Sequence, residues 1–207
     1  MHWFLAGAIA LIGLILAPGL SFYFDVTPKL VVLLLAVACA WTWPRPSWRN
    51  PLWVLTILSA LSLALSTHSS LGLWGSTWRR YGAITQITIL LLALALSTQS
   101  HQAVKILRVI VAAGAITAIY GIAQYFGFDP VLRAAAYHAG EGVWSIVRPP
   151  STLGYVSYFA TWLVFIVFLG FAIPGRLSLA ISGLAAAAMI LTGTRAAILG
   201  AAVGLAV

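Results

Sequence analysis

The feature that most constrains this chain is a succession of long apolar runs, separated by short breaks that hold most of its polar residues. A soluble fold must cover its outside with polar side chains. Only 7% of these residues are charged and 62% are hydrophobic, against about 25% charged residues in a typical soluble domain. We therefore exclude a soluble globular domain, a disordered segment and a disulfide-stapled secreted module, and we expect the chain to fold in lipid.

Clusters of proline, glycine and polar residues divide the chain into eight predicted helices. They cover residues 1–24, 28–43, 51–67, 83–97, 103–126, 153–173, 177–192 and 196–207. A bilayer crossing requires about 20 residues. Most of the first seven predicted helices are close to this length, whereas the eighth is much shorter. The predicted fold is all-α: a polytopic transmembrane helix bundle with seven complete helices plus a truncated eighth. We interpret residues 1–207 as a single transmembrane domain and expect it to be the N-terminal fragment of a longer chain.

The charge balance is strongly basic, with 11 Lys and Arg against 3 Asp and Glu, for a net charge of +8. The basic residues are scattered between apolar runs and form no basic stripe, so we expect no nucleic-acid partner. Positive charge beside membrane helices explains most of the excess, with membrane lipids as the neighbours. The basic residues divide almost evenly between the two predicted membrane faces, so charge alone does not decide the orientation.

Four arginines are predicted to share one membrane face, because each crossing changes the side on which the following break lies. They are Arg79, Arg80, Arg148 and Arg195, and all come shortly before a predicted helix. Helix N-termini present free N–H groups and the positive end of the helix dipole. Guanidinium groups match phosphate oxygens bidentately. This pattern favours an anion site suited to a pyrophosphate.

Three hydroxyl residues are expected to cap the helices behind these arginines. Ser151 and Thr152 would cap the sixth helix, and Thr194 the eighth. The alternative interpretation is that the arginines only anchor helices by reaching the headgroups. We prefer anchoring for arginines such as Arg176, weigh the two roles equally for Arg80, and favour binding for Arg148 and Arg195.

Other common sites are not predicted. The three acidic residues are too few and too dispersed for a carboxylate metal cage or a pair of catalytic carboxylates. The four histidines are not spaced as metal ligands, and the sequence has no phosphate-cradling glycine loop. We therefore predict no metal and no cofactor. The lack of an acidic residue inside the apolar runs argues against a proton pump.

Four segments together resemble the O-antigen ligase and O-antigen polymerase-like family of bacterial membrane glycosyltransferases. They are Gly75–Gly82 (GSTWRRYG), Tyr120–Pro130 (YGIAQYFGFDP), Arg148–Gly154 (RPPSTLG) and Thr192–Arg195 (TGTR). Their order and their placement between apolar runs carry the resemblance, which covers roughly residues 70–200.

The resemblance implies a membrane enzyme of cell-envelope polysaccharide and lipopolysaccharide biosynthesis. Such an enzyme moves a glycan from a polyprenyl-diphosphate carrier to a lipid or glycan acceptor, at the outer face of the bacterial cytoplasmic (inner) membrane. It implies that Arg148 and Arg195 bind the diphosphate, with Arg79 as a weaker third residue; Arg80 is a further candidate. It places the catalytic base on a later loop, beyond Val207, so the fragment alone is expected to be inactive.

Two other functions remain open at the level of sequence. A transporter or flippase half for an anionic polyprenyl-linked lipid would use the same arginine face without making or breaking a bond. A purely structural membrane subunit would use the arginines only as anchors.

Overall fold

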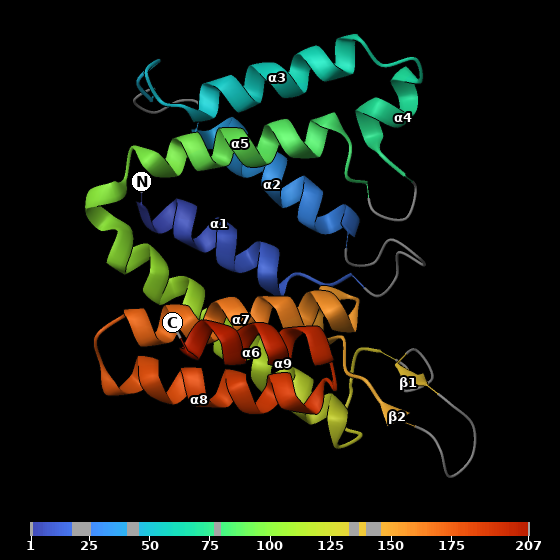
Figure 1. The fold of residues 1–207 in the computed structure, drawn as a ribbon, viewed down its shortest axis with the longest axis vertical. Coiled ribbons are helices and arrows are strands. Elements are labelled where there is room, and N and C mark those ends of the chain that lie inside the picture. The colour runs from blue at the N-terminus through green and yellow to red at the C-terminus, as the bar shows by residue number, and fades with distance from the viewer. Residues whose placement is uncertain are drawn as a thin grey trace. The chain divides into compact units, whose positions relative to one another are not determined.

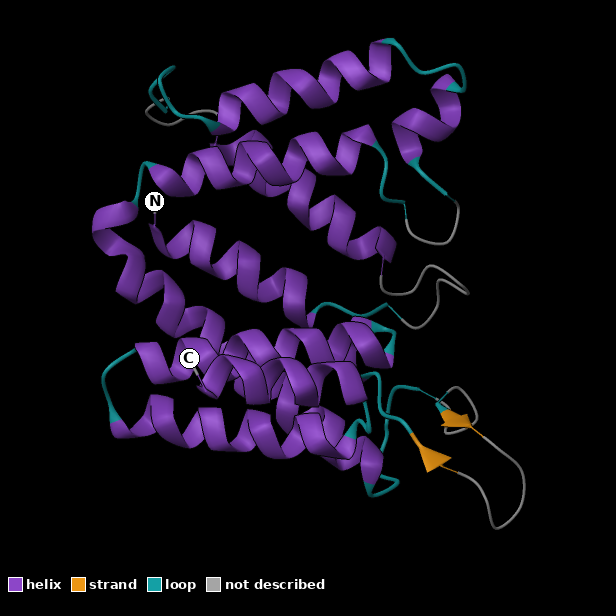
Figure 2. Cartoon of the chain, viewed as in Figure 1, coloured by secondary structure: helices purple, strands orange, loops and turns teal. Residues whose placement is uncertain are grey.

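The computed structural model describes residues 2–17, 26–40, 46–76, 80–132, 137–139 and 146–206. Most of these residues are helical, as Figure 2 shows, and strand is limited to one short hairpin within this part of the chain. The helices are α1 His2–Leu14, α2 Val26–Ala40, α3 Leu52–Ala64, α4 Ser69–Trp74, α5 Ala83–Ser97, α6 Ala103–Tyr125, α7 Val156–Ala172, α8 Arg176–Leu191 and α9 Arg195–Ala206. The hairpin consists of β1 His138–Ala139 and β2 Ile146–Val147.

The predicted helical class is confirmed, and two of the predicted helices match closely in their bounds. The predicted range 83–97 coincides with α5, and the range 103–126 exceeds α6 by one residue. The prediction of a loop over residues 68–82 was wrong in part, since α4 forms there. This helix has only 6 residues, too few for an apolar period to appear in the sequence.

One helical segment in the described ranges is both long and apolar enough to cross a membrane. It runs over Ser100–Tyr125, combining a 3₁₀ turn with α6, and an 18-residue stretch within it has a mean hydropathy of 2.0. Seven other apolar helices have 10–17 residues. At about 1.5 Å per residue, all seven are shorter than the hydrocarbon core of a bilayer, which is about 30 Å thick.

The contacts of the chain fall into two compact units. Unit 1 comprises Met1–Ile12 and Gly19–Ile106, and unit 2 comprises Gly13–Pro18 and Leu107–Val207. The single-domain organisation expected from the sequence stays a prediction.

In unit 1, helices α2, α3 and α4 pack against α5. Ala36 and Ala40 of α2 are buried, and small side chains let helices approach closely. The buried cluster of this unit consists of Leu5, Ala8, Leu30, Leu33, Ala36, Ala40 and Leu92.

In unit 2, helix α7 packs against both α8 and α9 (Figure 1). The side chains of Phe159, Leu163 and Ile166 on α7 are fully buried. Two glycines of α6 make room for this helix: a Cβ on Gly114 would press against Ile166, and one on Gly121 against the ring of Phe159. The end of α6 and the start of α7 are therefore held side by side, and this is where the candidate site forms.

Candidate functional site

Helix α6 ends in a turn that brings the chain back over its last residues. Gly127 adopts a φ of +85°, which glycine tolerates without strain. The N–H of Phe128 donates to the carbonyl of Ala123 at 2.9 Å, and the N–H of Gly127 donates to that of Gln124 at 3.0 Å. These two bonds form a Schellman-type helix end, and they carry Asp129 back towards the side chains of α6.

The Asp129 carboxylate accepts four hydrogen bonds at this turn. The hydroxyl of Tyr120 donates to its Oδ1 at 2.7 Å, and the amide Nε2 of Gln124 donates to its Oδ2 at 2.8 Å. The N–H groups of Val131 and Leu132 both donate to Oδ1 at 2.9 Å. Burial by itself would raise the pKa of Asp129, but the hydrogen bonds outweigh it and hold the pKa below its usual value. The carboxylate is thus charged and its oxygens are occupied.

Gln124 extends this network to the segment before α7. Its Oε1 accepts a hydrogen bond from the N–H of Ser151 at 2.8 Å. The Oγ of Ser151 donates in turn to the carbonyl of Thr117 at 2.7 Å. The side chains of Gln124, Thr117 and Ser151 are all fully buried. Ser151 has a left-handed φ of 51°, a strained conformation for a residue other than glycine, so these bonds hold a backbone shape that the residue does not prefer.

The predicted capping roles of Ser151 and Thr152 are wrong. Helix α7 begins at Val156, after a 3₁₀ turn over Ser151–Leu153 and a left-handed Gly154, and Tyr155 occupies its N-cap position. The Oγ1 of Thr152 donates instead to the carbonyl of Gly13 at 2.6 Å. Both hydroxyls tie the turn to neighbouring helices.

Arg148 lies between this turn and the hairpin. Its N–H donates to the carbonyl of Tyr137 at 3.0 Å, continuing the antiparallel pairing of His138 with Val147. Pro149 and Pro150, which follow it, are buried. Two prolines in succession restrict the backbone between Arg148 and Ser151. The backbone of Arg148 is therefore held on one side by the hairpin and on the other by the anchored turn.

A pocket of about 870 Å³ brings Arg148 together with Arg195. Its lining residues are Tyr125 from α6, Ile146, Val147 and Arg148 from the end of the hairpin, and Ile190, Leu191, Thr192, Gly193, Thr194 and Arg195 from the break between α8 and α9. Arg148 is half-buried and Arg195 is exposed. The two arginines that the sequence singled out most strongly thus line one cavity within unit 2.

The break between α8 and α9 is shaped by Thr192, which is fully buried. Its Oγ1 donates to the carbonyl of Met189 at 2.7 Å and accepts from the N–H of Thr194 at 3.2 Å. The expected side-chain cap by Thr194 was wrong: its Oγ1 is buried and has no hydrogen-bond partner among the described residues. The carbonyl of Thr194 accepts the first helical bonds of α9 instead, from the N–H groups of Ala197 and Ile198.

The pocket is electropositive as far as the described residues determine it. Asp129 is the one acidic residue in the described ranges, since Asp25 and Glu141 lie outside them. Its oxygens accept hydrogen bonds from Tyr120 and Gln124 of α6 and from the N–H groups of Val131 and Leu132. Neither guanidinium in the pocket forms an ion pair or hydrogen bond with another described residue, which leaves both available to an anion.

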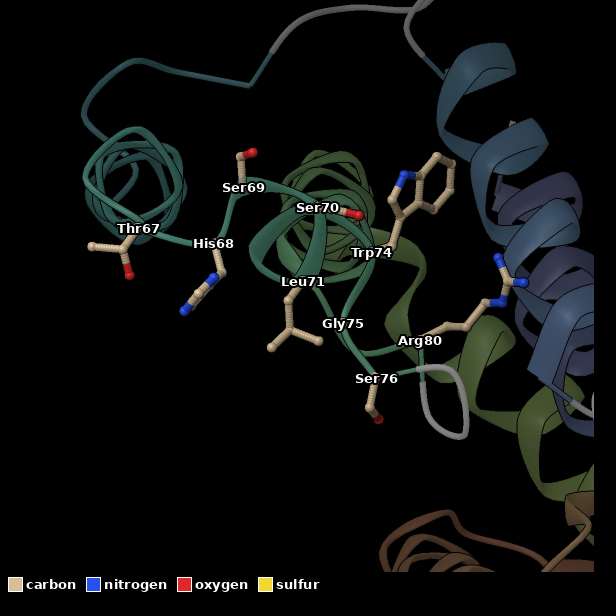
Figure 3. A pocket seen from close by; sticks show the side chains of 9 residues that line it. All are labelled: Thr67, His68, Ser69, Ser70, Leu71, Trp74, Gly75, Ser76 and Arg80. Atoms are coloured by element: carbon tan, nitrogen blue, oxygen red, sulfur yellow. The ribbon is translucent and has the colours of Figure 1, made fainter.

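The other candidate arginines belong to unit 1. Arg79 lies outside the described residues, so its predicted role is not tested. Arg80 has a left-handed φ of 45° and lines a second pocket, of about 950 Å³, together with His68 and Ser76. Figure 3 shows the Arg80 side chain extending to the opposite side of this pocket from His68. That all four arginines share one membrane face stays a prediction.

The two glycines of the GSTWRRYG segment have a structural role in unit 1. Gly75 has a φ of +75°, and a Cβ there would lie 2.6 Å from the backbone nitrogens of Tyr81 and Gly82. A Cβ on Gly82 would meet the backbone of Leu73 and Gly75 even more closely. The backbones therefore touch at the two ends of the segment, which only glycines allow.

Sequence reasoning missed the network that supports Arg148. Tyr120 and Gln124 are four residues apart, so they lie on one face of α6, and the helix-ending Gly127 and turn-forming Asp129-Pro130 follow directly. That spacing was a signal for a bond between Asp129 and α6. The link from Gln124 to Ser151, 27 residues away, had no local signal.

Comparison with known proteins identifies no relative: no protein-family model, no curated protein and no solved structure matches this chain.

Proposed function

We propose that this chain supplies the donor-binding part of a membrane glycosyltransferase of the O-antigen ligase type. The substrate class is a glycan on a polyprenyl-diphosphate carrier, and the acceptor is a lipid or another glycan. The location proposed with it is the bacterial inner membrane, with the apolar helices forming a polytopic bundle and the pocket at its outer face.

The observation that carries the proposal is the placement of Arg148 and Arg195 in one pocket with no carboxylate opposite them among the described residues. A diphosphate offers oxygens on two adjacent phosphorus atoms, so it can bind two guanidinium groups at once. Part of the pocket wall is apolar, since Ile146, Val147 and Ile190 line it. A headgroup of two phosphates joined to an apolar tail suits such a lining.

The chemistry follows from the charge that develops during transfer. When an acceptor oxygen attacks the anomeric carbon, the bond from that carbon to the diphosphate oxygen breaks, and negative charge accumulates on the departing diphosphate. Guanidinium groups already placed around it stabilise this charge more than the ground state, which lowers the barrier. In this proposal Arg148 and Arg195 act on the leaving group, and a base elsewhere in the enzyme takes the proton of the acceptor hydroxyl.

The proposal is tested by titrating the purified, detergent-solubilised protein with farnesyl diphosphate and with farnesyl monophosphate. We expect tighter binding of the diphosphate, and we expect Arg148→Ala and Arg195→Ala to reduce that preference. Arg176→Ala is the matched control, because Arg176 is exposed at the far end of α8 and is predicted only to anchor it. Equal binding of the two ligands, or equal loss in the control, contradicts a diphosphate site.

A second assay separates transfer from transport. Membranes that hold the full-length protein are supplied with a radiolabelled polyprenyl-diphosphate glycan, and the label is followed by chromatography. Label on the acceptor that disappears in Arg148→Ala supports the transferase. Donor that crosses the bilayer chemically unchanged supports the flippase alternative instead.

A further inference from the structure

The side-chain amide of Gln124 has one orientation that satisfies its neighbours. An amide oxygen can only accept and an amide nitrogen can only donate, while an ionised carboxylate only accepts and a backbone N–H only donates. Asp129 therefore requires Nε2 on its side, at 2.8 Å, and Ser151 requires Oε1 on the other, at 2.8 Å. The charge on Asp129 selects which end of the amide faces Ser151.

The orientation of the Gln124 amide affects the pocket through the short, stiff segment that links Ser151 to Arg148. Ser151 is separated from Arg148 only by Pro149 and Pro150. Its left-handed backbone is unfavourable for a residue other than glycine, so it depends on the hydrogen bonds that hold it. On the other side, the neighbour of Gln124, Tyr125, lines the pocket itself. The amide thus joins the two elements that bring Arg148 to the cavity.

We infer that Gln124 is a positioning residue for Arg148, and that Asp129 acts with it by fixing the direction of its amide. The inference rests on the proposed function for its purpose, because Arg148 needs a fixed place only if it binds an anion. Its geometry is independent of which anion binds.

The arrangement of bonds on Asp129 allows a sharp test. Oδ2 accepts a hydrogen bond from Gln124, while Tyr120, Val131 and Leu132 all donate to Oδ1. In the double variant Gln124→Glu/Asp129→Asn, the new amide nitrogen replaces Oδ2 and donates to the new carboxylate. The other carboxylate oxygen still accepts from Ser151. Every donor keeps an acceptor and the net charge of the pair stays the same.

Each single variant breaks the pairing. Gln124→Glu places two carboxylates against each other. In Asp129→Asn, the new amide nitrogen faces either the amide nitrogen of Gln124 or the donors that previously bonded to Oδ1, and both arrangements place donor against donor. The matched control is Ser182→Ala, which removes a buried hydrogen bond of 2.8 Å to the carbonyl of Val167 in the same unit, away from the pocket. It reports on stability without touching the positioning bonds.

The position of Arg148 is measured without any ligand. Spin labels are attached at Arg148→Cys and Arg195→Cys in a Cys39→Ser background, and their distance distribution is recorded by pulsed electron paramagnetic resonance. We expect a narrow distribution that broadens in Gln124→Glu, narrows again in the double variant and is unaffected by Ser182→Ala. An unchanged width in Gln124→Glu, or broadening that the double variant does not reverse, overturns the inference.

Binding of inorganic pyrophosphate to the unlabelled proteins forms the second part of the test. We expect Gln124→Glu to weaken it by about tenfold, the double variant to restore it, and Ser182→Ala to lower only the melting temperature. Pyrophosphate that binds in an Arg148-dependent manner but is indifferent to Gln124→Glu overturns the positioning role and leaves the proposed function intact. Conversely, spin-label distances that follow the expected pattern support the positioning role even if pyrophosphate does not bind and the proposed function fails.

Discussion

Removing Arg148, Arg195 or both should weaken anion binding, by an amount that depends on how deeply each side chain is buried. Arg148 is half-buried, in a setting where water screens its charge only partly. A hydrogen bond to a charged group in such a setting contributes about 1.5–3 kcal/mol. The Arg148→Ala variant should therefore bind inorganic pyrophosphate about tenfold to 100-fold more weakly than the unmodified protein.

Arg195 is exposed, so the expected loss is smaller. Exposed ion pairs are worth about 1 kcal/mol or less, which corresponds to about a fivefold weaker binding in Arg195→Ala. Because both residues line the same pocket, one pyrophosphate should contact both. An anion that has lost one guanidinium can shift towards the other, which limits the loss in each single variant, so the double variant should lose more binding free energy than the two single variants add up to. Neighbouring groups typically show about 0.5 kcal/mol or more of such coupling.

Isothermal titration calorimetry at neutral pH, on the four proteins of this cycle in the same detergent, measures these quantities. Arg176→Ala again serves as the control for general loss of positive charge. The reasoning is refuted if Arg195→Ala weakens binding more than Arg148→Ala, or if the two losses add without coupling. The first result would show that burial does not govern the contribution, and the second that the arginines do not share a ligand.

Other parts of the fold give further predictions. Phe159→Ala should destabilise the protein by about 3–5 kcal/mol, seen as a lower melting temperature, because this ring is fully buried in unit 2; a similar loss in Tyr158→Ala, whose side chain is exposed, would argue against that. Gly82→Ala should speed proteolysis within residues 75–82, since the added Cβ meets backbone, whereas Gly183→Ala, with nothing within 4 Å, should behave as the unmodified protein. The lowered pKa of Asp129 arises because hydrogen bonds outweigh burial, so its stabilising contribution is complete above about pH 4 and disappears as the pH falls through that lowered pKa. A melting temperature that falls equally on acidification in Asp129→Asn would contradict this assignment.

The helices were predictable where polar breaks limit an apolar run at both ends. Helix α5 lies between Gly82 and Thr98, and α6 ends before Gly127, so local residues mark their limits. The first predicted helix was extended across Pro18, but α1 ends at Leu14. Apolar composition alone could not show this end, because residues 15–17 are as apolar as the helix.

The candidate site was predictable in its charged residues and not in its support. Arg148 and Arg195 stand out because charge is rare in this chain. The predicted caps failed because a hydroxyl near a helix start has several partners to choose from, and those of Ser151 and Thr152 belong to α6 and α1. Such choices depend on which helices pack together, which one sequence without tertiary contacts does not reveal.

The glycines of α6 determine how the end of α6 and the start of α7 are aligned at the candidate site. Gly114 and Gly121 are seven residues apart, and so are the α7 side chains that fill the space they leave, Phe159 and Ile166. Because the two glycines are two helical turns apart, they fix the register of α7 against α6. Sliding α7 by one turn would press both bulky side chains against residues that carry a Cβ. The antiparallel register that results sets the N-terminal end of α7 beside the C-terminal end of α6. Changing the spacing of these two glycines should therefore misalign the segment that carries Arg148.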